Sequence, residues 1–151
     1  MSGQAAKLRA YTDADEEAAI ALWLRTWQKA YPDIDFSARL PWWRERWRNE
    51  LVGRTYIVVA DSAGGLTGFV TVDPKTRYLD QIVVAPEFWG SNVATLLLDA
   101  GKRVAPGRIE LLVNKDNARA ITFYEKHGFV MAGDDVNPVS GRAVFRMRWR
   151  P

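Results

Sequence analysis

The sequence contains no cysteine and only one histidine, His127. Without cysteine the chain has no disulfide framework, no thiolate nucleophile and no cysteine metal site, which suits a reducing cytoplasm. We therefore expect a cytoplasmic protein without a bound metal. His127 stands immediately before Gly128 at the end of a helical pattern. A helix-terminal role is commoner for such a histidine than a catalytic one.

Long apolar runs are also missing. No segment approaches the length of a bilayer span, and residues 1–15 lack the hydrophobic core of a signal sequence. These features predict a soluble, unexported chain that does not bind a membrane.

Charge of one sign is not concentrated anywhere in the chain. The sequence has 21 Lys+Arg and 18 Asp+Glu, for a net charge of +3. The arginines within residues 44–48 and 146–150 alternate with other residue types, as they do on solvated faces. We therefore expect no nucleic-acid partner.

The length and composition are those of one globular domain. The chain has 151 residues, of which 48% are hydrophobic and 26% charged, and no break in composition separates one part from another. We expect a single domain over residues 1–151.

Periodic apolar side chains predict helices and strands that alternate in the second half of the chain. Helical spacing or capping occurs in four segments: residues 11–33, 36–51 with Pro41 near its start, 93–104, and 117–128. Short runs rich in β-branched residues predict strands at residues 55–61, 66–73, 78–86, 108–113 and 142–149. The first three read as antiparallel strands joined by tight turns. The fold class is therefore α/β, with a mixed, mostly antiparallel central sheet flanked by helices on both faces.

The segment "APEFWGSNVATLLLDAGKR", residues 85–103, connects a strand to a helix through a loop with a single glycine, Gly90. The free N–H groups of a helix N-terminus form an anion site, although such connections are common. The loop lacks the glycine pattern of dinucleotide-binding proteins and the Gly-Lys-Ser/Thr of P-loops, so nucleotide triphosphate hydrolysis is not supported.

A second motif lies downstream. Residues 84–98 followed by 111–129 resemble the GCN5-related N-acetyltransferases (GNAT), which transfer an acetyl group from acetyl-coenzyme A to an amine. The family's second motif, N-x-x-A-x-x-[FL]-Y-x-x-x-G-F, is met in full by Asn117, Ala120, Phe123, Tyr124, Gly128 and Phe129. The first, V-x-P-x-x-[QR]-x-x-G-x-[GA], is met at Val84, Pro86 and Ala94. Trp89 replaces its Gln/Arg and Asn92 replaces its central glycine.

The resemblance implies the acyl-coenzyme A N-acyltransferase fold and acetyl-coenzyme A as co-substrate. It also implies a set of cofactor-binding residues: Ile82, Val83, Val84, Trp89, Gly90, Ser91, Asn92, Val93, Ala94, Thr95, Asn117 and Tyr124. Asn tolerates a left-handed backbone better than other non-glycine residues, so we expect Asn92 to keep the path of the glycine that it replaces. Trp89 either stacks on the cofactor or covers the helix end with apolar surface.

Catalytic roles follow from the same resemblance. The main-chain N–H groups of residues 82–84 would polarise the thioester carbonyl, and Tyr124 would protonate the leaving thiolate. A phenol suits this step because its pKa, about 10, lies above that of a thiol at about 8.5. Alternatively, Tyr124 is an aromatic side chain of the core. The general base is open among Tyr78, Asp80 and Gln81, of which only Asp80 is a carboxylate. The alternative for Asp80 is an exposed charge at a strand edge.

The acceptor is expected to be an amine of a small molecule or a protein, bound between the first two helices and the sheet. The aromatic residues of that segment favour an aromatic or apolar substrate portion, and no acidic cluster marks a polyamine site. A homodimer is an open possibility. The alternative to an enzyme is a non-catalytic acyl-coenzyme A binding or sensing module on the same fold.

Overall fold

Two antiparallel sheets form the centre of the protein. The computed structural model describes residues 6–138 and 140–151. The first sheet has the order β1-β2-β3-β4, and its strands are Lys7–Ala10, Tyr56–Ser62, Gly65–Val72 and Leu79–Val84. The second has the order β5-β7-β6, with β5 at Ile109–Asn114, β6 at Phe129–Val136 and β7 at Ala143–Trp149. The expected antiparallel strands are confirmed, and β1 and β6 are additions to the strand ranges predicted above.

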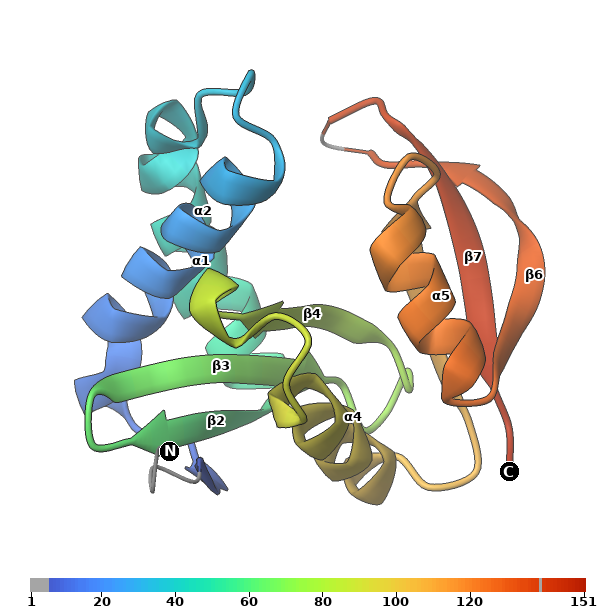
Figure 1. The fold of residues 1–151 in the computed structure, drawn as a ribbon, viewed down its shortest axis with the longest axis horizontal. Coiled ribbons are helices and arrows are strands. Elements are labelled where there is room, and N and C mark those ends of the chain that lie inside the picture. The colour runs from blue at the N-terminus through green and yellow to red at the C-terminus, as the bar shows by residue number, and fades with distance from the viewer. Residues whose placement is uncertain (1–5, 139) are drawn as a thin grey trace.

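The junction between the sheets is short. Tyr78 and Glu110 form an isolated parallel bridge, and the Glu110 N–H donates to the Arg77 carbonyl at 3.0 Å. The sheets then separate, with β4 on one side and β5 to β7 on the other (Figure 1). The expected single central sheet is thus divided in two. Near the bridge, the register of β3 and β4 shifts between Thr71 and Val72, which leaves Asp80 as an extra residue in β4.

Helices α1, α2, α4 and α5 lie within the predicted segments, and α3 lies just beyond the second of them. Their bounds are Glu16–Ala30 for α1, Leu40–Arg46 for α2, Val52–Arg54 for α3, Val93–Val104 for α4 and Ala118–Lys126 for α5. Pro41 lies in the first turn of α2, as expected, where its missing N–H costs no helical hydrogen bond. Beyond α2 the chain widens into a π-helical turn, Trp47–Leu51. No helix of the described residues is long and apolar enough to cross a membrane.

The side chains of β2 and β3 alternate between the two faces of the sheet, and each face packs into its own hydrophobic core. Ile57 and Phe69 pack with the aromatic residues of α1 and α2, whereas Val58 and Val70 pack on the opposite face with α4. The second of these cores continues into the other sheet and includes Tyr124 of α5. The shared core holds α4 and α5 along the opening between β4 and β5.

Candidate functional site

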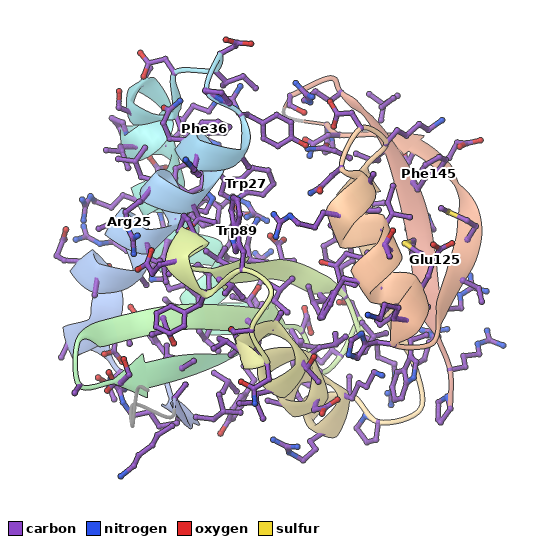
Figure 2. All side chains as sticks on the ribbon, viewed as in Figure 1. Arg25, Trp27, Phe36, Trp89, Glu125 and Phe145 are labelled. Carbon is purple, nitrogen blue, oxygen red and sulfur yellow. The ribbon has the colours of Figure 1, made fainter. Side chains whose placement is uncertain are left out.

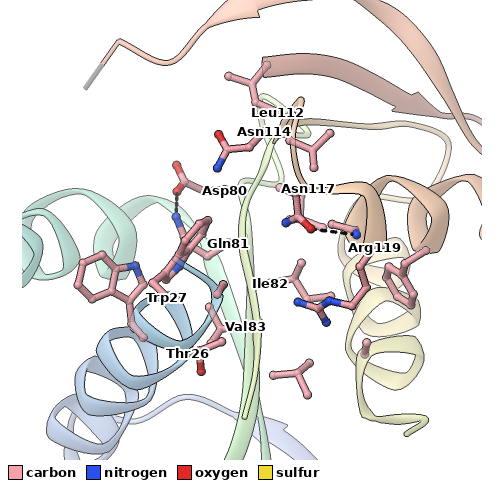
Figure 3. A pocket seen from close by; sticks show the side chains of 18 of the residues that line it. Thr26, Trp27, Asp80, Gln81, Ile82, Val83, Leu112, Asn114, Asn117 and Arg119 are labelled. Carbon is pink, nitrogen blue, oxygen red and sulfur yellow. Dashed lines mark hydrogen bonds between the residues drawn. The ribbon is translucent and has the colours of Figure 1, made fainter. Parts of the chain in front are cut away.

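A cavity of about 760 Å³ occupies the space where the two sheets separate. Its walls come from α1, α2, β4, the loop before α4, β5 and α5. In close-up, β4 runs between α1, which carries Thr26 and Trp27, and α5, which carries Arg119 (Figure 3). The cavity therefore has a face toward α1 and α2 and another toward α4 and α5.

The open edge of β4 exposes main-chain groups to this cavity. The Ala85 N–H donates to Thr67 of β3 at 2.9 Å. Since main-chain groups alternate in direction along an antiparallel strand, Val83 also faces β3, while Ile82 and Val84 point their N–H and C=O groups away from it. Of the three expected main-chain contacts, Ile82 and Val84 are thus on the open side.

The loop before α4 supplies further amides. Hydrogen-bond partners among the described residues are absent for the N–H groups of Gly90, Asn92, Ala94 and Thr95, whereas the Val93 N–H donates to Ser91 Oγ at 3.3 Å. The left-handed position in this loop is Gly90, with φ of 84°. Asn92 has φ of −85° and ψ of 3°. The expectation that Asn92 replaces a left-handed glycine is therefore wrong, because its conformation is open to any residue.

Trp89 lies across the end of β4. Its indole Nε1–H donates to the Val84 carbonyl at 2.8 Å, and the Arg119 guanidinium carbon lies 4.0 Å from the ring centroid. Trp89 lies in the same half of the molecule as Trp27 (Figure 2), and both residues line the cavity. Arg119, which the sequence analysis did not single out, thus completes an aromatic and cationic pair between the two sheets.

Tyr124 is buried, and its side chain lines the cavity. Its ring packs against Phe123 and Phe129, with both centroids 5.5 Å away. The described part of the chain offers its hydroxyl no hydrogen-bond partner. Burial raises the pKa of Tyr124 well above its ordinary value, so that the phenol stays protonated at neutral pH. Tyr124 is thus an aromatic side chain of the core that also lines the cavity, and its role as a proton donor stays a prediction.

Asp80 is held by an arginine that the sequence analysis missed. Its two carboxylate oxygens accept hydrogen bonds from Arg46 at 3.0 and 2.5 Å, and Gln81 Nε2 donates to it at 3.2 Å. The Asp80 side chain is only 14% exposed, so the alternative of an exposed edge charge is wrong. The neighbouring Tyr78 also lines the cavity, and burial, together with the charge of Asp80, raises the pKa of Tyr78 to about 12.

Several expected site residues have structural roles. Asn117 caps α5 by accepting a hydrogen bond from the Ala120 N–H at 3.2 Å, and it also lines the cavity. Val93 is buried in the core, and Asn92 is exposed. His127 is the C-terminal cap of α5, as expected, and its Nδ1 lies 2.8 Å from the Phe123 carbonyl.

One polar network joins the two halves beside the cavity. The Tyr31 hydroxyl, at the end of α1, donates to Asp116 at 2.9 Å and accepts from Asn114 Nδ2 at 3.1 Å. Arg142 pairs with Asp116, and its guanidinium carbon lies 4.8 Å from the centroid of the Tyr31 ring. In the described ranges, no group of three or more His, Asp or Glu side chains could hold a metal ion.

An open strand edge, a helix N-terminus with unpaired amides and a buried tyrosine thus meet in one cavity. A family model described as the acetyltransferase (GNAT) family matches residues 16–129. The chain belongs to this family. The match includes the strand β4, the loop before α4 and the whole of α5.

This GNAT chain is similar in sequence to a curated acetyltransferase and similar in fold to solved structures. It is 33% identical to the spermidine N(1)-acetyltransferase of Escherichia coli K12 over an alignment of 88 residues, which covers 54% of this chain and 47% of the relative. The match therefore spans about half the length of that relative. The structure of PaiA N-acetyltransferase from Thermoplasma acidophilum in complex with coenzyme A has a TM-score of 0.78 at 19% identity, with full coverage of both chains. A GCN5-related N-acetyltransferase from Rhodopseudomonas palustris has a TM-score of 0.77 at 20% identity, covering 100% of this chain and 99% of that one.

Proposed function

We propose that this protein transfers the acetyl group of acetyl-coenzyme A to an amine. The observation that carries the proposal is that the open edge of β4 and the buried Tyr124 line one cavity. The family membership and the coenzyme A complex of the PaiA structure support the same cofactor.

The residues present fit this cofactor. Unpaired amides at Gly90, Asn92, Ala94 and Thr95 suit a pyrophosphate, because a helix N-terminus presents N–H donors and a partial positive charge. Arg119 and Lys126 of α5 add positive charge at the cavity wall. The cavity volume of about 760 Å³ is within the usual range for a ligand of this size class.

The chain's own groups account for each requirement of the reaction. Bound acetyl-coenzyme A supplies the acetyl thioester. One main-chain N–H group on the open edge of β4, that of Ile82 or that of Val84, would donate a hydrogen bond to the carbonyl oxygen of the bound thioester, on which negative charge develops. Tyr124 gives its proton to the leaving sulfur, and Asp80 accepts the proton of the attacking amine, directly or through water. Arg46 holds the Asp80 carboxylate in the wall of the cavity.

A titration followed by a turnover assay tests the proposed function. We expect acetyl-coenzyme A to bind in calorimetry and free thiol to appear when an acceptor amine is added. Binding without turnover on a broad panel of amines would instead support the non-catalytic acyl-coenzyme A module. Absence of binding would contradict both functions.

Replacement of Asp80 by asparagine tests the base. We expect the Asp80→Asn variant to lose about 100-fold in kcat/KM near pH 6 and less near pH 9, because more of the amine already lacks its proton at high pH. The measurement is a pH-rate profile of both proteins.

The Asp80→Asn substitution also breaks the ion pair with Arg46 and leaves that half-buried arginine without a carboxylate, so the loss of the ion pair needs its own control. The Arg46→Gln variant breaks the same ion pair but retains Asp80. If Asp80 is the base, Arg46→Gln keeps more activity than Asp80→Asn. Equal losses in the two variants, or an unchanged pH-rate profile, would assign Asp80 a structural role and direct attention to Tyr78.

A further inference from the structure

Aromatic rings form the wall of the cavity that faces α1 and α2. Trp27 and Tyr31 stack with ring centroids 5.8 Å apart and an interplanar angle of 16°, and Phe36 lies 6.0 Å from Trp27. Trp42, which also lines the cavity, remains 40% exposed. These rings offer a flat apolar surface to which an aromatic group can pack by offset or edge-to-face contact.

Positive charge dominates the lining of the same cavity. Among the described lining residues, five side chains are cationic, namely Arg39, Arg46, Arg119, Lys126 and Arg142, and one is a carboxylate, Asp80. Arg46 pairs with Asp80 and Arg142 with Asp116, while Arg119 and Lys126 lie on α5, so Arg39 is the cation of the α1 and α2 face that has no ion pair in the described structure. A polyamine, which keeps one or two ammonium groups beside the reacting amine, would meet the charge of Arg39 here and find no carboxylate other than the one that Arg46 already neutralises.

The unused hydrogen-bonding capacity of this wall consists mainly of donors. Arg39 lies 5.1 Å from the Phe36 ring centroid and forms no ion pair with a described carboxylate. A guanidinium only donates hydrogen bonds, so it suits a carboxylate and cannot satisfy an ammonium.

We propose that the acceptor is a primary amine that carries both an aromatic ring and a carboxylate, of the aromatic α-amino acid type, and not a polyamine. This inference rests on the proposed acetyl transfer. The aromatic body packs on Trp27 and Trp42, and the carboxylate binds at Arg39. In the reaction the acceptor nitrogen forms the new bond to the acetyl carbon and loses a proton, while the carbon–sulfur bond breaks and the sulfur takes a proton.

Four acceptors separate the elements of this proposal. L-Phenylalanine and 2-phenylethylamine differ only in the carboxylate, L-alanine lacks the ring, and spermidine is a polyamine. We expect kcat/KM, expressed per unprotonated amine, to be highest for L-phenylalanine and about tenfold lower for 2-phenylethylamine, since a charge-assisted hydrogen bond is lost. L-Alanine and spermidine should stay close to background.

Two variants test which residues bind the carboxylate and the aromatic ring of the acceptor. Arg39→Gln should abolish the tenfold preference for L-phenylalanine over 2-phenylethylamine, with acetyl-coenzyme A affinity unchanged. Trp42→Ala should raise KM for both aromatic acceptors with a smaller effect on kcat. The matched control is Arg54→Gln, because Arg54 is exposed, lies in α3 and is not a lining residue of the cavity.

The possible failures are distinguishable. Acetylation of spermidine at a rate equal to or above that of L-phenylalanine would overturn the inference and leave the proposed function intact. The same holds if the carboxylate makes no difference, or if only amines without an aromatic ring are acetylated. Absence of turnover with every amine, despite cofactor binding, would overturn both the inference and the proposed acetyl transfer.

Discussion

Replacement of Tyr124 by phenylalanine is expected to lower kcat about 100-fold or more, because it removes the proton donor for the leaving thiolate and retains the ring. Affinity for acetyl-coenzyme A should change by less than about twofold, since Tyr124 makes its packing contacts through the ring. Steady-state kinetics with an excess of acceptor, together with calorimetric titration of the cofactor, measures both quantities. Equal kcat in the two proteins would exclude Tyr124 as the acid.

The pH dependence gives a second readout for the same residue. Burial raises the pKa of Tyr124 above the ordinary value of a phenol, about 10, so its neutral, proton-donating form persists as the pH rises. We therefore expect no fall in kcat from this group between pH 8 and about pH 10. A falling limb in that range that disappears in Tyr124→Phe would contradict the expected direction of the pKa change.

Truncation of Trp43 to alanine is expected to have the largest effect on stability. Trp43 is 1% exposed and stacks on Trp23, with ring centroids 4.5 Å apart and an interplanar angle of 10°. Loss of a buried indole leaves a cavity that the helices cannot fill, at a cost of about 3–5 kcal/mol in the free energy of unfolding. Urea denaturation followed by circular dichroism measures the change.

The matched variant for this site is Trp43→Phe. It keeps an aromatic ring against Trp23 and removes an indole N–H that has no partner among the described residues. We expect a cost of only about 1–2 kcal/mol, because the smaller void is partly offset by relief of the unsatisfied donor. A cost equal to that of alanine would show that the ring stack contributes little.

Local sequence signals predicted most helices and strands of this fold. Helix α5 begins after Asn117 and ends before Gly128 because its cap and its left-handed glycine are encoded within the segment itself. Strand β1 was missed since three of its four residues are exposed and the stretch shows no alternation. The division of the sheet arises because β4 and β5 do not pair beyond the bridge between Tyr78 and Glu110, and no local pattern could predict the pairing of strands that are distant in sequence.

The candidate site was also predicted in part, through residues that belong to a local motif. The motif at 117–129 identified Tyr124 and Asn117, whose positions in the cavity depend on one short helix. Arg46 and Arg119 were missed because their partners, Asp80 and Trp89, lie on other elements of the fold. A tertiary ion pair or cation–π contact has no spacing in the sequence from which to infer it.

The polar network at Tyr31 has a consequence for how firmly the cavity is shaped. Main-chain bonding near Tyr78 and Glu110 joins the sheets at one place, and the hydroxyl of Tyr31 joins the end of α1 to Asn114 and Asp116 at another. With two separate connections, we expect the spacing of the walls to be set by the fold, so that little ordering of the protein accompanies the entry of a substrate.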